Sequence, residues 1–175
     1  MIITTKGDIL KSNAQAIVNP VNTVGVMGKG LALQIREKFP NVYNIYRNAC
    51  KLGKVQIGKM FVVSTGLDSY PEYIINFPTK KHWKEKSKLW YIQQGLDDLI
   101  EVIQQRSIHT VALPAIGCGL GGLDWNVVYE IIDMKLSSLP DSIAIFVYEP
   151  YSGKEGKKRP SILQQCDRLC EMNWR

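Results

Sequence analysis

The stretch TVALPAIGCGLGG, residues 110–122, passes directly from an apolar run into a run of closely spaced glycines. Its first half has the continuous apolar character of a strand that is buried on both faces of a parallel sheet. Glycines adopt positive φ angles and place no Cβ between the backbone and a ligand, as a cradle for phosphate groups requires. Ligands of open α/β sheets bind at the carboxyl ends of strands, so this loop is a candidate binding site. Glycine-rich turns also serve purely structural purposes, and the stretch alone leaves both interpretations open.

Further strands and helices are predicted on either side of this stretch. Short apolar or β-branched runs at residues 2–5, 16–18, 60–64, 73–77 and 142–148 are typical of strands. Helical patterns occupy residues 31–39, 42–52 and 123–139, and a further helix opens after Ser87 as a possible N-cap. Strands that alternate with helices predict a layered α/β sheet.

Composition and length limit the class of protein. The chain has 175 residues, a net charge of +6 and 45% hydrophobic residues, which predicts a single domain with one ordinary core. No apolar run approaches the ~20 residues that cross a bilayer, and the N-terminus lacks the layout of a signal peptide. We therefore expect a cytoplasmic protein without membrane contact. For residues 151–175 we expect a polar loop and a last helix near 162–172, packed on the same domain.

A loop earlier in the chain resembles this glycine-rich stretch in following a predicted strand and leading into a helix. Residues 19–30, NPVNTVGVMGKG, lead from the predicted strand at 16–18 into the helix at 31–39. Two such loops in equivalent topological positions favour a shared ligand. Neither loop has the Walker spacing or the dinucleotide glycine fingerprint, so a P-loop or Rossmann cofactor is poorly supported.

Charged, sulfur-bearing and histidine residues add three observations. Asp8 follows the first predicted strand and is an acceptor suited to an adenine amino group, although for this residue alone a turn or cap aspartate is the more ordinary interpretation. A basic patch between residues 79 and 89 holds five lysines with His82 and Trp83. The four cysteines and two histidines show no zinc spacing, so we expect free or structural thiols and no metal or other cofactor.

Three linked motifs resemble the macrodomain family, whose members bind ADP-ribose. They are GDIL at residues 7–10, AIVNPVN at 16–22 and LPAIGCG at 113–119, and the resemblance covers residues 1–150. Within that family, GVMGKGLA at 25–32 and NFPTKKHW at 76–83 are similar to the DarG-type antitoxin macrodomains. The resemblance implies a three-layer α/β/α macrodomain with a mixed central sheet.

The same resemblance implies an activity. DarG-type macrodomains remove ADP-ribose from thymine bases in DNA and so reverse the modification made by a DarT-type toxin. It therefore implies a metal-independent DNA ADP-ribosyl glycohydrolase, with ADP-ribosylated single-stranded DNA as substrate and a DarT-type transferase as partner. The alternatives are a non-catalytic ADP-ribose reader and a hydrolase that removes ADP-ribose from proteins.

Site residues are implied position by position. Asp8 with Ile9 would hold the adenine, residues 117–122 would wrap the phosphates, and residues 22–30 would border the distal ribose. The implied substrate-binding residues are Asp8, Ile9, Asn22, Gly25, Val26, Met27, Gly28, Lys29, Gly30, Gly117, Cys118, Gly119, Leu120, Gly121 and Gly122. Lys80 would be catalytic. Related enzymes that act on proteins carry a catalytic aspartate where this chain has Gly121, which counts against their mechanism.

Lysine chemistry fits the bond to be broken, which joins a ribose anomeric carbon to a thymine ring nitrogen. A neutral Lys80 amine can attack that carbon and form a Schiff-base-type intermediate. Alternatively, a charged Lys80 can act as a general acid toward the departing base. We expect the nucleophile role, with Lys81 supplying a like charge that depresses the pKa of Lys80. His82 and Trp83 would flank the thymine, although Trp83 as a core residue is an open alternative.

Overall fold

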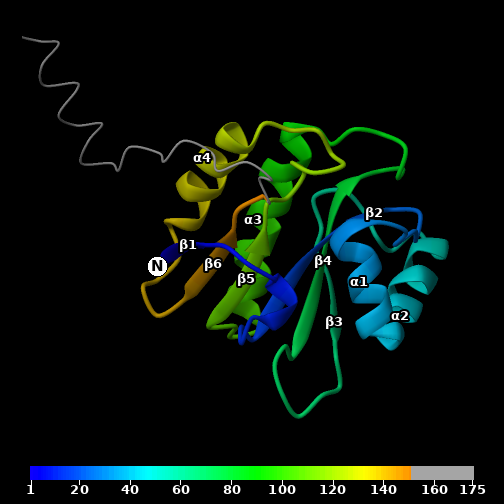
Figure 1. Cartoon of the computed structure of the whole chain (residues 1–175), viewed down its shortest axis with the longest axis horizontal. Helices are drawn as coiled ribbons and strands as arrows, with labels where there is room; N and C mark the ends of the chain where they lie inside the picture. Colours follow the sequence, from blue (N-terminus) through cyan, green and yellow to red (C-terminus); the bar gives the residue numbers. More distant parts are fainter. Residues whose placement is uncertain (151–175) are drawn as a thin grey trace, which may run out of the picture.

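The computed structural model describes residues 1–150, which form a six-stranded sheet between two pairs of helices (Figure 1). A short 3-10 helix, η1 (Ile9–Lys11), follows the first strand. The strands are β1 (Ile2–Thr5), β2 (Ala16–Asn22), β3 (Phe61–Ser64), β4 (Tyr73–Lys80), β5 (Thr110–Pro114) and β6 (Ala144–Tyr148). The helices are α1 (Gly30–Lys38), α2 (Pro40–Lys51), α3 (Leu89–Gln105) and α4 (Trp125–Leu136).

The sheet has the strand order β1-β6-β5-β2-β4-β3. Every neighbouring pair is parallel except β3 with β4, which is antiparallel. The predicted α/β fold with a mixed central sheet is therefore confirmed. The parallel order aligns the carboxyl ends of β2, β4 and β5 along one edge, where ligands of such sheets bind.

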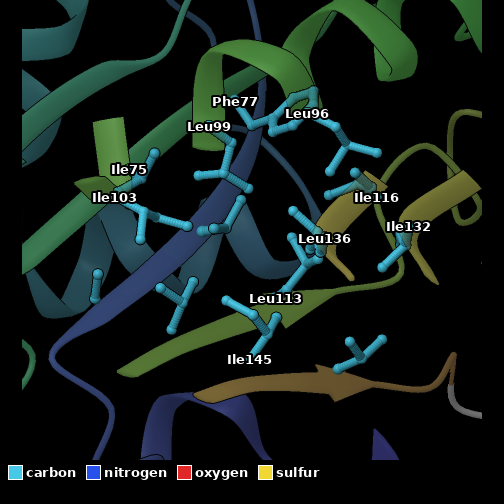
Figure 2. Close-up of a cluster of buried hydrophobic side chains, with 14 of the residues drawn as sticks. Ile75, Phe77, Leu96, Leu99, Ile103, Leu113, Ile116, Ile132, Leu136 and Ile145 are labelled. Atoms are coloured by element: carbon cyan, nitrogen blue, oxygen red, sulfur yellow. The ribbon is translucent and has the colours of Figure 1, made fainter. Parts of the chain in front are cut away.

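One face of the sheet is covered by α3 and α4. Alternate strand residues such as Val18, Ile75 and Leu113 point to this face, as the two-residue period of a strand requires. They pack against the apolar sides of the two helices, including Leu96 and Ile132 (Figure 2). This cluster is the larger part of the core and fixes the position of α3, which begins beside the edge described above.

The opposite face is covered by α1 and α2. Ile17, Ile74 and Ala112, each next in sequence to a residue of the first face, pack here against Ile35 of α1 and Val42 of α2. Two helices therefore cover each face of the sheet, which confirms the predicted three-layer arrangement (Figure 1).

Several element ends differ from the sequence prediction. β2 and β4 run on to Asn22 and Lys80, so these two side chains stand on strands and not in the loops after them. Ser87 does not cap α3, because Lys88 occupies the N-cap position and the Ser87 N–H donates to the Gly121 carbonyl oxygen at 3.0 Å. The predicted loop and helix at 151–175, with two of the cysteines, lie outside the described residues. No helix within residues 1–150 is long and apolar enough to span a membrane.

Candidate functional site

A cleft of about 630 Å³ opens at the carboxyl ends of β2, β4 and β5. Three segments form its walls: the first loop (residues 23–29) with the start of α1, the lysine segment (residues 81–88), and the glycine loop (residues 115–122). The two loops that the sequence marks as similar therefore meet in one cavity, because parallel strands bring their following loops to the same edge.

The first loop is shaped by the side chain of Asn22. Its Oδ1 accepts hydrogen bonds from the backbone N–H groups of Val24 at 3.1 Å and Val26 at 3.2 Å, and its Nδ2 donates to the Val26 carbonyl oxygen at 2.6 Å. The buried Tyr46 hydroxyl donates to the Asn22 carbonyl oxygen at 2.6 Å. Asn22 lines the cleft, but its amide is occupied with the loop backbone. It therefore holds the loop in place more than it offers free polar atoms to a ligand.

The first loop leads into the N-terminus of α1. Helix α1 begins at Gly30 without a side-chain cap, so its first amide groups are not satisfied by an N-cap residue. Residues 28–32 line the cleft at this point. Uncapped amides and the positive end of the helix dipole make a helix N-terminus a ready site for an anion.

The glycine loop folds back on itself in tight turns. Gly117 has φ of +75°, and the Leu123 N–H donates to the Gly117 carbonyl oxygen at 3.0 Å. A Cβ on Gly121 would lie 2.1 Å from the Gly117 carbonyl oxygen and 2.4 Å from the Ser87 Oγ. A side chain at position 121 would therefore require the backbone of the loop to shift. The carbonyl of Gly121 is itself held by the Ser87 N–H.

Lys80 is the last residue of β4 and is brought to the cleft by an irregularity in the sheet. The register of β2 with β4 pairs Val21 with Pro78 but Asn22 with Lys80, so one residue of β4 is left over between them. Such bulges re-aim a side chain near a functional site. The Lys80 side chain is buried, with 9% of the residue exposed, and its Nζ donates to the Leu120 carbonyl oxygen at 2.7 Å.

The environment of Lys80 favours its neutral form. Burial lowers the pKa of Lys80, and the nearby ammonium of Lys86 lowers it further. The sequence had pointed to Lys81 for this effect, and that expectation is wrong. Lys81 is exposed and does not line the cleft, whereas Lys86 does. The like charge that acts on Lys80 thus comes from Lys86 of the lysine segment and not from its sequence neighbour Lys81.

Trp83 lies at the mouth of the cleft and is half exposed, which rules out the alternative of core packing. The Lys84 Nζ lies 5.0 Å from the centre of its ring. The ring of His82 lies 5.4 Å from that of Trp83, but His82 does not line the cleft. An exposed indole beside a lysine ammonium is suited to stack on an unpaired base.

The structure brings together most of the predicted binding residues. Those that line the cleft are Asn22, Val26, Gly28, Lys29, Gly30, Lys80, Trp83, Gly117, Gly119, Leu120 and Gly121. Those that do not are Asp8, Ile9, Gly25, Met27, Cys118, Gly122 and His82.

Three of these exceptions have a visible structural role. The Oδ1 of Asp8 accepts from the Leu10 N–H at 3.0 Å and caps η1, the ordinary alternative that the sequence left open. Met27 is buried in a small cluster beneath the first loop, with 1% of its surface exposed. Cys118 packs, partly buried, against the main core; burial raises its pKa to about 11, helped by the charge of Asp124, so its thiol stays protonated at neutral pH.

Sequence reasoning missed several residues of the site. Thr79 lines the cleft as the residue left over in the bulge, and Glu85 places a carboxylate there. Leu31 and Ala32 line it from the first turn of α1. The sequence predicts that a helix begins after the first loop, and this predicted helix start is the one signal that could have placed Leu31 and Ala32 in the site. Within residues 1–150, no group of three or more histidines, cysteines or carboxylates is placed to hold a metal ion.

Comparison with known proteins adds sequence relatives. Residues 18–132 match the Macro domain family model. A DNA ADP-ribosyl glycohydrolase from Mycobacterium tuberculosis is 51% identical over 153 residues, with 87% of this chain and 43% of that protein covered. A DNA ADP-ribosyl transferase-DNA ADP-ribosyl glycohydrolase fusion protein from Thermosipho africanus is 35% identical over 157 residues, with 81% and 40% covered. The chain thus spans less than half the length of these curated relatives.

Solved structures show the same fold. The macrodomain of Mycobacterium tuberculosis DarG superimposes with a TM-score of 0.84 at 50% identity, over 86% of this chain and 99% of that one. Thermosipho africanus DarTG in complex with ADP-ribose superimposes with a TM-score of 0.79 at 34% identity, over 93% of this chain and 44% of that one.

Proposed function

This chain belongs to the Macro domain family, and from that membership we propose that it is a DNA ADP-ribosyl glycohydrolase that removes ADP-ribose from thymine bases of single-stranded DNA. The observation that carries the proposal is Lys80, a buried lysine whose pKa is lowered, at the edge of a cleft lined by two glycine-containing loops. The names of the relatives and the ADP-ribose complex support the same substrate.

Binding of the ADP-ribose part rests on backbone groups. Residues at the start of α1 and in the glycine loop line one cavity, and backbone amides of helix N-termini and glycine-rich loops bind phosphate oxygens. The glycines leave room for the backbone to approach a diphosphate closely. The distal ribose then lies between the first loop and the glycine loop, within reach of Lys80.

The reaction follows from the state of the Lys80 amine. In its neutral form the Nζ lone pair attacks the anomeric carbon of the distal ribose, and the bond to the thymine nitrogen breaks with its electron pair on the base, which takes up a proton. The ribosylamine formed in this way opens when the bond between its anomeric carbon and the ring oxygen breaks; the electron pair goes to that oxygen, which takes up the proton from Nζ, and a Schiff base remains on Nζ. Water hydrolyses this Schiff base, which frees ADP-ribose and restores the amine. The Leu120 carbonyl oxygen accepts a hydrogen bond from Nζ and holds its position.

The pH dependence of the rate separates this role from general acid catalysis. If Lys80 is the nucleophile, the single-turnover rate rises with pH and levels off above its lowered pKa, because each pH unit below that value reduces the neutral fraction roughly tenfold. If Lys80 is the general acid, the rate instead falls as pH rises through the same pKa. Trapping with borohydride gives a covalent adduct at Lys80 only in the first case.

The test of the activity is release of ADP-ribose from a thymidine-ADP-ribosylated single-stranded oligonucleotide. We expect wild type to release it and Lys80→Ala to lose at least about a hundredfold in rate, the lower range for a lost acid–base group. ADP-ribose affinity, measured by calorimetry, should change little, because the backbone loops remain. Lys81→Ala is the matched control and should keep the activity, since Lys81 lies outside the cleft.

Two outcomes would replace the proposal. Binding of ADP-ribose without release by wild type would make the protein a reader of the modification. Release from modified protein in preference to modified DNA would make it a protein-directed hydrolase, although this chain has Gly121 where the resemblance implies an aspartate for that mechanism.

The same proposal extends to a partner and a place. The Thermosipho africanus relative is named as a fusion of a DNA ADP-ribosyl transferase with a glycohydrolase. We infer that this chain acts as antitoxin to a DarT-type transferase, in the cytoplasm where bacterial DNA lies. Co-expression tests this: wild type should rescue growth of cells that express such a transferase, and Lys80→Ala should not. Rescue by Lys80→Ala would instead indicate that the protein acts by sequestering the toxin.

A further inference from the structure

Two hydrogen bonds connect the lysine segment and the residue before it to the glycine loop. Just before the segment the Lys80 Nζ donates to the Leu120 carbonyl oxygen at 2.7 Å, and near its end the Ser87 N–H donates to the Gly121 carbonyl oxygen at 3.0 Å. Lys86 is the residue immediately before the second attachment. The position of its backbone is therefore fixed relative to both Lys80 and the glycine loop.

The side chain of Lys86 lies along the glycine loop. Its Nζ is 3.2 Å, and its Cδ 3.3 Å, from the point where a Cβ on Gly122 would be. Lys86 lines the cleft together with Gly121 and Lys80. Within residues 1–150 the cations of the ion pairs are the N-terminal amine, Lys6, Lys59 and Lys135, so Lys86 has no carboxylate partner there.

The charges that face Lys80 are unevenly distributed. The lysine segment contributes Lys84, Glu85 and Lys86 to the cleft, and the start of α1 contributes Lys29. The cleft-lining parts of β2 and of the glycine loop carry no titratable side chain. Of these groups Lys86 is the one whose charge lowers the pKa of Lys80, in addition to burial.

A bound diphosphate changes this balance. Two negative charges in the glycine loop favour the ammonium form of any nearby lysine, and they would oppose the formation of a neutral Lys80. An unpaired cation beside Gly122 is placed to neutralise those charges first. This argument rests on the proposed binding of ADP-ribose in the cleft.

We propose that Lys86 is a positioning residue for the reaction, whose ammonium group pairs with the diphosphate in the glycine loop and so offsets the effect of those negative charges on the neighbouring Lys80 amine. Lys86 acts through Lys80 and through the phosphates, and it does not itself touch the bond that breaks. One residue thus serves substrate affinity and the protonation state of the nucleophile.

The test compares three variants. Lys86→Met removes the charge and keeps the side-chain length, Lys86→Arg keeps the charge, and Lys81→Met removes a charge at an exposed position outside the cleft. Three quantities are measured: the midpoint of the Lys80 side-chain titration by lysine-selective NMR, the affinity for ADP-ribose by calorimetry, and the pH profile of single-turnover release from modified DNA.

Lys86→Met should raise the Lys80 midpoint, shift the rising limb of the rate profile to higher pH by the same amount, and reduce the rate at neutral pH by roughly tenfold for each pH unit of that shift. It should also weaken ADP-ribose binding. Lys86→Arg should restore all three quantities. Lys81→Met should leave the midpoint and the pH profile as in wild type.

Three results would overturn the role of Lys86. One is an unchanged Lys80 midpoint in Lys86→Met, the second is an equal loss in Lys86→Arg, and the third is an equal shift in Lys81→Met. The titration and the calorimetry need no turnover, so they remain readable if wild type releases nothing from modified DNA. In that case the proposed glycohydrolase activity fails by itself, and the two failures are distinguishable.

Discussion

Gly121 sets the limits of the site at the scale of a single residue. Its Cβ position is blocked by the carbonyl oxygen of Gly117, a backbone atom that cannot move without opening the loop. We expect Gly121→Ala to destabilise the protein by about 1 to 3 kcal/mol, the usual cost of an overpacked site. For a chain of this size, thermal unfolding should show a lower Tm by roughly 2 to 4 °C per kcal/mol.

Gly119 in the same loop is the matched control. A Cβ there meets no atom within 4 Å, and its φ lies outside the left-handed region. Gly119→Ala should therefore unfold at nearly the wild-type temperature. Equal losses of Tm in both variants would mean that the loop tolerates no alanine at all and that the contact with Gly117 is not the cause.

At the scale of a single element, the N-terminus of helix α4 is capped by Asp124, directly after the glycine loop of the site. The Asp124 Oδ1 accepts from the backbone N–H groups of Asn126 at 2.8 Å and Val127 at 3.2 Å, directly after the glycine loop closes. Asp124→Ala should cost about 1 kcal/mol of unfolding free energy, as loss of an N-cap does. Asp124→Asn keeps an acceptor oxygen and should lose less. Denaturant titration measures both, and a larger loss in Asn than in Ala would contradict the capping role.

At the scale of the whole molecule, the chain carries a net charge of +6, and the cleft is lined by Lys29, Lys84 and Lys86 besides Lys80. If Lys84 contacts a DNA phosphate next to Trp83, affinity for the modified oligonucleotide should fall with salt, with a slope of ~0.7 per contacted phosphate. Lys84→Gln should reduce that slope by about one such contact. Lys54→Gln, at an exposed position outside the cleft, is the control and should not. An unchanged slope in Lys84→Gln would remove Lys84 from the DNA path.

The sequence predicted the elements better than it predicted their ends. Within residues 1–150, all six predicted strands and all four predicted helices lie near their apolar patterns, because hydrophobic periodicity reflects which face each element buries. The carboxyl ends of β2 and β4 were missed. Proline and polar residues there gave no strand signal. These ends are strand because β2 and β4 pair with each other as far as Asn22 and Lys80.

The candidate site divides in the same way. The sequence alone determined which loops bear glycine and, through its motifs, which lysine to consider, because both depend on residue type and order. Only the tertiary structure decided that Lys86 and not Lys81 acts on Lys80, that Asp8 caps η1, and that position 121 has no room for a side chain. Charge and steric repulsion act through space, and the distances that govern them are set when segments far apart in the chain pack together.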